Sequence, residues 1–184
     1  MKITAGRYTV VLTNDDAFIP GSADNIVQYS KVYLPNPPDY QCAQLGIFVM
    51  EADNMISSAL VAAEGVSISA STVPAIVEEA RLILCLADTL FCLAIPGLDL
   101  VWRVKADTAL CFQVFRYRED YIVHGELEIS RIDHHGNIVW QRSGADIFTT
   151  VDGKEAFWLA HNYIFATDFQ NNQYKFDYDG IDIS

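Results

Sequence analysis

The chain has 184 residues, of which 51% are hydrophobic and 20% are charged, and its net charge is −12. This composition is typical of a globular protein of one domain and excludes a disordered chain. The negative charge argues against binding to nucleic acid or to an anionic membrane surface and would favour a basic partner or a cation, although solubility alone also accounts for an acidic surface.

The first residues lack the features of a targeting signal. Their short apolar run, Val10 to Leu12, ends at Asn14-Asp15-Asp16. A secretory signal needs a longer apolar stretch followed by a cleavage site. No window reaches the roughly 18 consecutive apolar residues of a membrane span. We therefore expect a cytoplasmic protein that does not insert into a membrane.

Residues 1–72 are expected to form strands and one hairpin. Tyr8 to Leu12 is an apolar run that ends in residues that turn readily. Ile26 to Leu34 has no cleanly polar face, which predicts a strand packed on both sides. The apolar runs within residues 46–60 flank Asp53-Asn54 and predict a hairpin.

Helix signals are weak throughout the chain. The longest helix-compatible window, Val73 to Ala80, is roughly two turns long and fits an extended conformation equally well. The preceding residues, 64–72, are small and polar and predict a connector. Wherever the sequence favours regular secondary structure, it therefore favours strands over helices.

Residues 81–184 repeat one pattern about every forty residues. The three copies open with the triplets Leu82-Ile83-Leu84, Tyr121-Ile122-Val123 and Tyr163-Ile164-Phe165. Each copy continues through a polar turn to a second strand. Two of the copies end in similar triplets, Leu100-Val101-Trp102 and Ile138-Val139-Trp140. Repetition at this period indicates β-units that stack and bury their faces on one another.

The four cysteines do not form a C-x-x-C motif, which argues against the common zinc and redox frameworks. A hairpin that turned at Asp88-Thr89 would place Cys85 directly opposite Cys92, so a cross-strand disulfide is geometrically conceivable. A reducing cytosol and the frequency of buried thiols favour core packing instead.

The string from Tyr121 to Trp140 resembles the blade repeat of quinoprotein-type (PQQ-like) β-propellers. In that family an aspartate precedes a turn glycine, and a tryptophan at the end of the next strand docks between blades. The resemblance covers residues 81–180 and implies blade-like sheets. The residues to which it assigns structural roles are Trp102, Asp133, Gly136, Trp140, Asp177 and Gly180.

The chain departs from this family in several respects. Asp133 and Gly136 are one residue closer than the usual spacing, Ala94 stands where the first copy should have its aspartate, and the third copy has no tryptophan. No quinone cofactor is implied, because the enzymes that bind it are far longer. The chain also resembles a group of small bacterial proteins that share the words at residues 124–131 and 143–148.

The predicted fold is one all-β domain over residues 1–184, with strands and a hairpin in 1–72 and three blade-like repeats in 81–184. The antiparallel sheets would form a partial β-propeller or a propeller-like array, with a sandwich as the alternative. An unclosed array leaves edge strands exposed, and these predict self-association or binding of a partner.

The best candidate site is the cluster His124, Glu126 and Glu128, placed at a hairpin tip by the alignment of the copies. An imidazole and two carboxylates there could bind a divalent cation or act as general acid and base, whereas the alternative is a solvated turn. Asp146 and Asp168 complete the set of candidate binding residues. We assign no catalytic residue and no metal ligand, and the adjacent pair His134-His135 would need further convergent ligands to hold zinc.

Two functions follow from these patterns. The leading hypothesis is a non-enzymatic module that binds a protein partner, possibly a basic one, as a cytoplasmic inhibitor or immunity-type protein would. The alternative is a metal-dependent hydrolase that uses His124, Glu126 and Glu128. For the leading hypothesis we expect no cofactor, and the sequence contains no nucleotide-binding motif.

Overall fold

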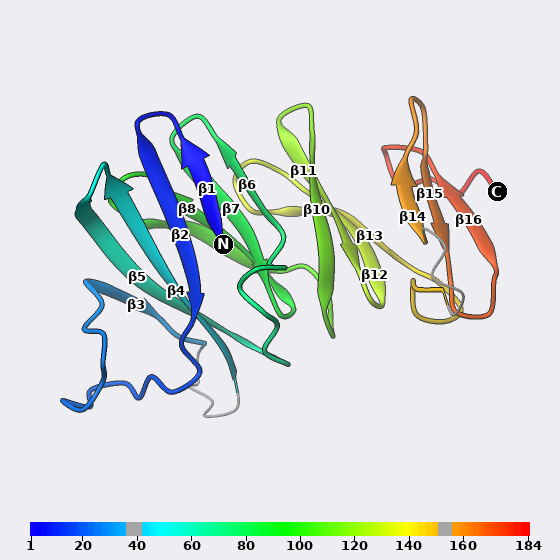
Figure 1. Ribbon diagram of the computed structural model, residues 1–184. Helices are drawn as coiled ribbons and strands as arrows, with labels where there is room; N and C mark the ends of the chain where they lie inside the picture. The colour runs from blue at the N-terminus through cyan, green and yellow to red at the C-terminus, as the bar shows by residue number, and fades with distance from the viewer. Residues whose placement is uncertain (36–41, 151–155) are drawn as a thin grey trace.

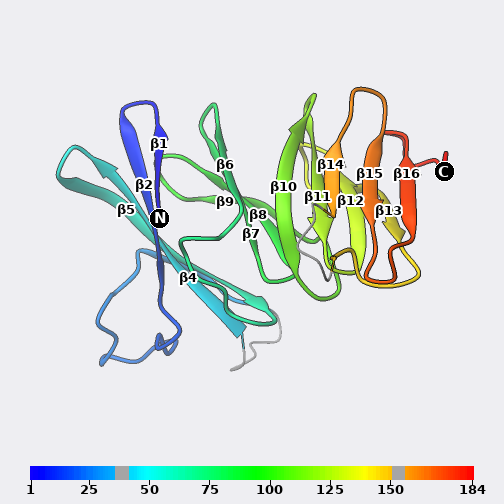
Figure 2. The same ribbon diagram turned by 45° about the vertical axis from the view of Figure 1, so that its right-hand side comes forward.

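A computed structural model describes residues 1–35, 42–150 and 156–184, and its regular structure in these ranges consists of β-strands. The strands form four sheets that follow one another along the chain (Figure 1). Turned by 45°, the sheets stand side by side like blades in an open row (Figure 2). No helix in these ranges is long and apolar enough to cross a membrane. The predicted all-β, blade-like fold is confirmed.

The first sheet has five strands and the others have four, four and three. The first contains, in spatial order, β1 (Lys2–Ala5), β2 (Tyr8–Asn14), β4 (Cys42–Glu51), β5 (Asn54–Glu64) and β3 (Lys31–Tyr33). The second contains β6 (Ala75–Glu78), β7 (Arg81–Leu86), β8 (Thr89–Ala94) and β9 (Leu100–Lys105). The third contains β10 (Cys111–Tyr117), β11 (Asp120–Gly125), β12 (Glu128–Ile132) and β13 (Ile138–Ser143). The fourth contains β14 (Phe157–Leu159), β15 (Ile164–Thr167) and β16 (Gln173–Phe176).

The N-terminal predictions were right for one hairpin and wrong for one strand. β4 and β5 form the expected antiparallel hairpin around Asp53. Of the strand predicted over Ile26 to Leu34, only Lys31–Tyr33 is formed, and it pairs in parallel with β5. The preceding residues instead lie across the outer face of the first sheet, where the Tyr29 ring stands 5.7 Å from that of Phe48. This contact accounts for Tyr29, whereas Ile26 in the same segment is fully exposed.

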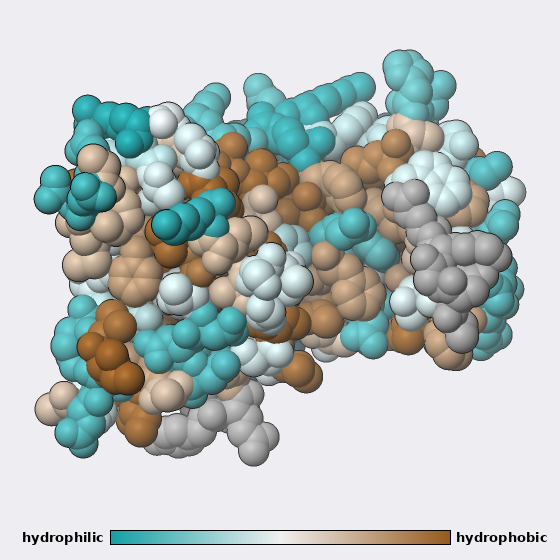
Figure 3. All heavy atoms as spheres, in the orientation of Figure 1, coloured by the Kyte–Doolittle hydropathy of each residue, from teal (hydrophilic) through white to brown (hydrophobic). Residues whose placement is uncertain are grey.

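Three hydrophobic clusters fill the spaces between neighbouring sheets. The strands of the second and third sheets contribute side chains to a cluster on each side, so β7 is buried along almost its whole length. Strands covered on both faces have continuous rather than alternating apolar sequences. Figure 3 shows hydrophobic residues across the middle of the view and hydrophilic ones along the upper edge, where the β1–β2, β6–β7, β10–β11 and β14–β15 turns lie.

The cysteine prediction needs one correction. The β7–β8 hairpin turns at Ala87 and Asp88, so Cys92 pairs with Ile83 and is not opposite Cys85. A positive φ of 47° at Ala87 makes this turn possible one residue earlier than expected. Cys85 and Cys92 are buried thiols in the core between the second and third sheets, as the core-packing interpretation predicts. Cys111 lies in the same cluster, where a hydrogen bond with Cys85 and burial raise the pKa of its thiol.

A tryptophan joins the second sheet to the third, and another joins the third to the fourth. The indole N–H of Trp102 donates to the carbonyl oxygen of His134 at 3.0 Å, and that of Trp140 donates to the carbonyl oxygen of Tyr178 at 3.0 Å. Each indole lies on a turn glycine of the next sheet. A Cβ atom on Gly136 or Gly180 would stand 2.7 Å from the ring, so only glycine allows this approach.

An aspartate begins each of the two turns that receive a tryptophan. Asp133 Oδ1 accepts hydrogen bonds from the backbone N–H groups of His135 and Asn137. Asp177 Oδ1 likewise accepts hydrogen bonds from the backbone N–H groups of Asp179 and Ile181. A carboxylate that bonds its own turn fixes the direction of the carbonyl group that meets the indole.

Polar side chains join the first sheet to the second. Ser57 occupies the position in the first sheet that Trp102 occupies in the second, because each residue pairs with the preceding strand beside a β-bulge. The Ser57 hydroxyl donates to the carbonyl oxygen of Pro96. Strand β3 adds Tyr33, whose hydroxyl donates to the carbonyl oxygen of Leu98 at 2.9 Å. All three joints therefore connect one sheet to the turn that follows the third strand of the next.

The third copy of the repeat is shorter than the sequence predicts. Ile164 pairs with Phe176 as Tyr121 pairs with Ile132, so the copy begins at Ile164 rather than at Tyr163. After β16 the chain turns back, and Asp182 forms a single bridge to Phe176 in the place of a fourth strand.

Candidate functional site

Carboxylates collect along one side of the row of sheets, where one set of strand ends and turns lies (the lower side in Figure 1). They come from the ends of β2, β5, β9 and β13 and from the turns β7–β8, β11–β12 and β15–β16. We call this region the acidic rim. Its exposed or half-buried members are Asp15, Asp16, Glu64, Glu126, Glu128 and Asp146, and its buried members are Asp88, Asp107 and Asp168. All four sheets contribute, although the members are far apart in the sequence.

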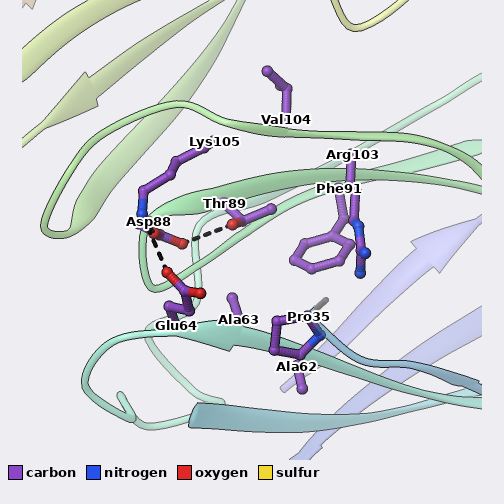
Figure 4. A pocket seen from close by; sticks show the side chains of 10 residues that line it. All are labelled: Pro35, Ala62, Ala63, Glu64, Asp88, Thr89, Phe91, Arg103, Val104 and Lys105. Atoms are coloured by element: carbon purple, nitrogen blue, oxygen red, sulfur yellow. Dashed lines mark hydrogen bonds and ion pairs between the residues drawn. The ribbon is translucent and has the colours of Figure 1, made fainter. Parts of the chain in front are cut away.

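A pocket of about 230 Å³ opens on the rim between the first and second sheets (Figure 4). Lys105 Nζ lies 2.8 Å from Asp88 and 3.3 Å from Glu64. The hydrogen bond to Asp88 raises the pKa of Lys105, so this side chain stays charged. Phe91 and Ala62 supply apolar walls. A ligand group entering here would meet a lysine flanked by two carboxylates, above a hydrophobic surface.

A second pocket of about 310 Å³ continues the first along the rim. It shares Glu64, Asp88 and Lys105 with the first pocket and reaches Glu126 on the third sheet. Together the two pockets form a groove that crosses three sheets. Such a groove suits an extended segment of a partner better than a compact small molecule.

Asp107 holds the middle of the rim in place. Its side chain is buried and accepts hydrogen bonds from the backbone N–H groups of Leu127 at 3.0 Å, Glu128 at 2.8 Å and Ala109 at 2.6 Å. A Cβ atom on Gly125 would lie 2.0 Å from the Asp107 carboxylate, so glycine is required there. Sequence reasoning missed Asp107, and the only signal was the glycine in the facing turn.

His124 lies in the interior and not on the rim. Its ring nitrogens stand 3.1 Å from Gln113 Oε1 and 3.0 Å from the carbonyl oxygen of Phe148, and its ring stacks on Phe157 at 4.4 Å. The backbone carbonyl oxygen of Phe148 can only accept, so the ring hydrogen lies on Nε2, and Nδ1 accepts a hydrogen bond when the Gln113 amide turns its NH2 group toward it. Burial lowers the pKa of His124 from its usual 6.5 to about 4. The imidazole is therefore neutral and hydrogen-bonded within the protein.

The structure divides the five candidate binding residues into two groups. His124 and Asp168 are buried, and the Asp168 carboxylate organises its own turn by accepting hydrogen bonds from Asn172 and Tyr174. Glu126, Glu128 and Asp146 are half-buried on the rim. Within the described ranges, no group of three or more histidines, cysteines and acids is arranged to hold a metal ion.

The buried imidazole predicts a pH dependence of stability. Between about pH 6.5 and pH 4 the unfolded chain binds a proton at His124 that the folded protein does not bind, so stability falls as the pH falls through this window. The full loss is about 3 kcal/mol. Urea unfolding of the wild type and of His124→Gln isolates the contribution of His124, because the carboxylates contribute equally to the pH dependence of both proteins. We expect the wild type to lose its advantage as the pH approaches 4; a difference that is constant with pH would contradict the assignment.

No protein-family model and no curated protein sequence matches the chain. Solved structures do. The computationally designed Ika4 protein matches 60% of this chain and 69% of its own at a TM-score of 0.50 and 9% identity. The designed Ika8 protein matches 78% of this chain and 45% of its own at 0.54 and 10%.

Dihydro-heme d1 dehydrogenase NirN in complex with DHE matches the whole of this chain and 42% of its own, at a TM-score of 0.52 and 12% identity. The chain thus spans less than half the length of Ika8 and of NirN. At these identities the likeness concerns the fold alone. Together with the four stacked sheets and the joints between them, it shows that the chain has a propeller-like all-β fold.

Proposed function

We propose that the protein is a non-enzymatic binding module that holds a basic protein partner along its acidic rim. The observation that carries this proposal is the groove that crosses three sheets and is bordered by Glu64, Asp88 and Glu126. A cytoplasmic inhibitor or immunity-type protein that covers a basic surface of its target would use such a groove. The kinship of the repeats with quinoprotein-type blades and with small bacterial proteins is part of the same proposal.

The electrostatics of the rim support a cationic partner. Burial and the nearby charge of Asp107 raise the pKa of Glu128, so this part of the rim already carries unfavourable like-charge interactions. A bound cation would relieve them. The net charge of −12 also accelerates association with a partner of opposite sign. Lys105 and Arg103 offset part of this charge at the end of the groove that holds Glu64 and Asp88. Among the described residues of the groove, this leaves the half-buried Glu126 as the acid without a nearby cation at the other end.

Charge removal on the rim tests the proposal. A lysine-rich peptide is the probe, with a neutral peptide of equal length for comparison, and binding is measured by calorimetry at low and moderate salt. We expect Glu64→Gln combined with Glu126→Gln to weaken binding about twofold to thirtyfold, as loss of two exposed ion pairs would. The control is Glu119→Gln, an exposed acid in the β10–β11 turn on the opposite side.

Two results would count against a basic partner on the rim. One is equal affinity of the rim variant and the control variant for the lysine-rich peptide. The other is affinity that does not change with salt, because exposed charge pairs are screened by ions.

A further inference from the structure

Each joint within the molecule pairs a cation of one sheet with a turn of the next. At the joint between the third and fourth sheets, Arg131 donates to the carbonyl oxygen of Tyr178 at 2.8 Å and lies 3.1 Å from Asp179. At the first joint, Lys31 donates to the carbonyl oxygen of Gly97 and lies 2.6 Å from Asp99. In both cases the turn that receives the cation supplies a carboxylate.

The cation at the second joint is Arg81, which donates to the carbonyl oxygen of His134 at 3.3 Å. All three joints therefore have the same ingredients: a side chain that reaches a turn carbonyl, a cation beside it, and apolar residues beneath. We call the face of a sheet that supplies the cation its presenting face. The opposite face, which supplies the turn, is its receiving face.

No other sheet in the described ranges packs on the presenting face of the fourth sheet. Phe165 on this face is buried at 7% exposure, stacked against Trp158. Trp158, Phe165 and Lys175 are cross-strand neighbours on this face. The Trp158 ring stacks on that of Phe165 at 3.8 Å and is 37% exposed. Ile183, which is 49% exposed, lies beside Lys175, because its backbone N–H donates to the Lys175 carbonyl oxygen.

Lys175 stands where Arg131 stands in the preceding sheet. Each is the next-to-last residue of the third strand, followed by an apolar residue and then by the turn aspartate. Arg131 uses this position to reach the turn of the next sheet. Lys175 is exposed, and its ammonium group lies 5.6 Å from the centre of the Tyr163 ring instead of reaching a turn of another sheet.

The first sheet has a receiving face that is open at the matching position. A groove of about 420 Å³ on this face is lined by Lys2, Thr9, Val11, Phe48, Met50, Ala52 and Asp53. The pairs Thr9–Met50 and Val11–Phe48 occupy the positions of Tyr121–Ile132 and Val123–Ser130 on the receiving face of the third sheet. The β4–β5 turn, at upper left in Figure 1, corresponds to the turn that receives Trp102 and carries the exposed carboxylate of Asp53.

The segment that precedes β3 covers the other half of this face. Tyr29 packs on Phe48 and donates its hydroxyl hydrogen to Asp15 at 2.8 Å, at the end opposite to the β4–β5 turn. In Figure 1 the segment lies below the first sheet, away from the turn. The half that it leaves open carries a cation, Lys2, and a carboxylate, Asp53, beside apolar side chains.

We infer that a second copy of this chain packs head to tail on the first, with the fourth sheet of one copy on the first sheet of the other and Lys175 paired with Asp53. The contact repeats the cation-to-turn part of the internal joints, with an exposed lysine opposite an exposed aspartate over apolar side chains. Within the described residues, the fourth sheet has no fourth strand that could supply an indole as β13 does. A head-to-tail contact of this kind closes into a ring or continues as a filament, according to its rotation. It uses the faces of the sheets, unlike the edge-strand pairing that the sequence predicts.

Charge reversal at the two positions tests the inference. Sedimentation velocity over a concentration series gives the self-association constant of the wild type, Lys175→Glu, Asp53→Lys and the double variant. We expect each single reversal to weaken self-association at least about tenfold, as breaking a close interfacial charge pair does. The double variant restores the pair with opposite polarity, and we expect its association to return to near the wild-type value.

The control reversal is Glu119→Lys, which lies outside both faces and should leave association unchanged. All three positions are exposed, and circular dichroism verifies that each variant is folded. A wild-type protein that stays monomeric at every concentration would overturn the inference. So would single reversals that leave association intact, or a double variant as weak as its parents.

Discussion

Trp140→Ala is expected to lower the free energy of unfolding by about 3–5 kcal/mol. The indole is 7% exposed and packs between the third and fourth sheets with Ile122 and Phe157. Its removal leaves a cavity that the backbone turn at Gly180 cannot fill by itself, because the turn is held by the carboxylate of Asp177. The carbonyl oxygen of Tyr178 loses one donor but keeps Arg131, so the cavity contributes most of the loss.

Denaturant unfolding measures this loss, and Val139→Ala is its matched control. Val139 is the neighbouring residue of the same strand and is 51% exposed, so its truncation should change stability by no more than about 0.5 kcal/mol. If the two variants were equally stable, Trp140 would not be a joint between sheets.

Gly180→Ala should destabilise the protein by about 2–5 kcal/mol for two separable reasons. The residue has a φ of +80°, which is strained for any residue with a Cβ atom. The added methyl group would also stand 2.7 Å from the Trp140 ring, so the indole or the turn must move. Overpacking of this kind typically costs about 1–3 kcal/mol beyond the backbone strain.

Gly6→Ala separates the two contributions. Gly6 has a φ of +62° and no heavy atom within 4 Å of an added Cβ, so its substitution should cost only the strain, about 1–2 kcal/mol. In a Trp140→Ala background, Gly180→Ala should fall to that same cost, because the ring it meets is gone. Additive losses in the double variant would show that the methyl group and the indole do not meet.

The all-β fold was predictable because its signals are local and repeated. Turn residues separate short apolar strands, and Trp102 and Trp140 end similar words at similar distances. Register was less predictable. The β7–β8 hairpin turns through Ala87, a residue without turn preference, and this moved Cys85 out of line with Cys92. A displacement of one residue is decided by packing on both faces, which no local pattern reports.

The candidate site was predictable only in part, because burial depends on residues distant in the sequence. His124 lies at the expected end of its strand, but Phe148 and Phe157 cover it from the segment that follows the third sheet. Asp107 escaped notice because its importance comes from the backbone of the facing turn. The groove on the rim is lined by three sheets, so its existence follows from how the sheets stack and not from any one of them.

The joints also determine how the molecule can come apart. Because each of the three hydrophobic clusters lies between two neighbouring sheets, cohesion comes mainly from nearest-neighbour couplings, as in other repeat architectures. The fourth sheet is the smallest of the four and is coupled on one side only, through Trp140 and the cluster around it. Its detachment leaves the other three sheets with their own contacts intact. Partial opening at this end therefore requires less free energy than global unfolding, and sheets in the middle of the row are the last to separate.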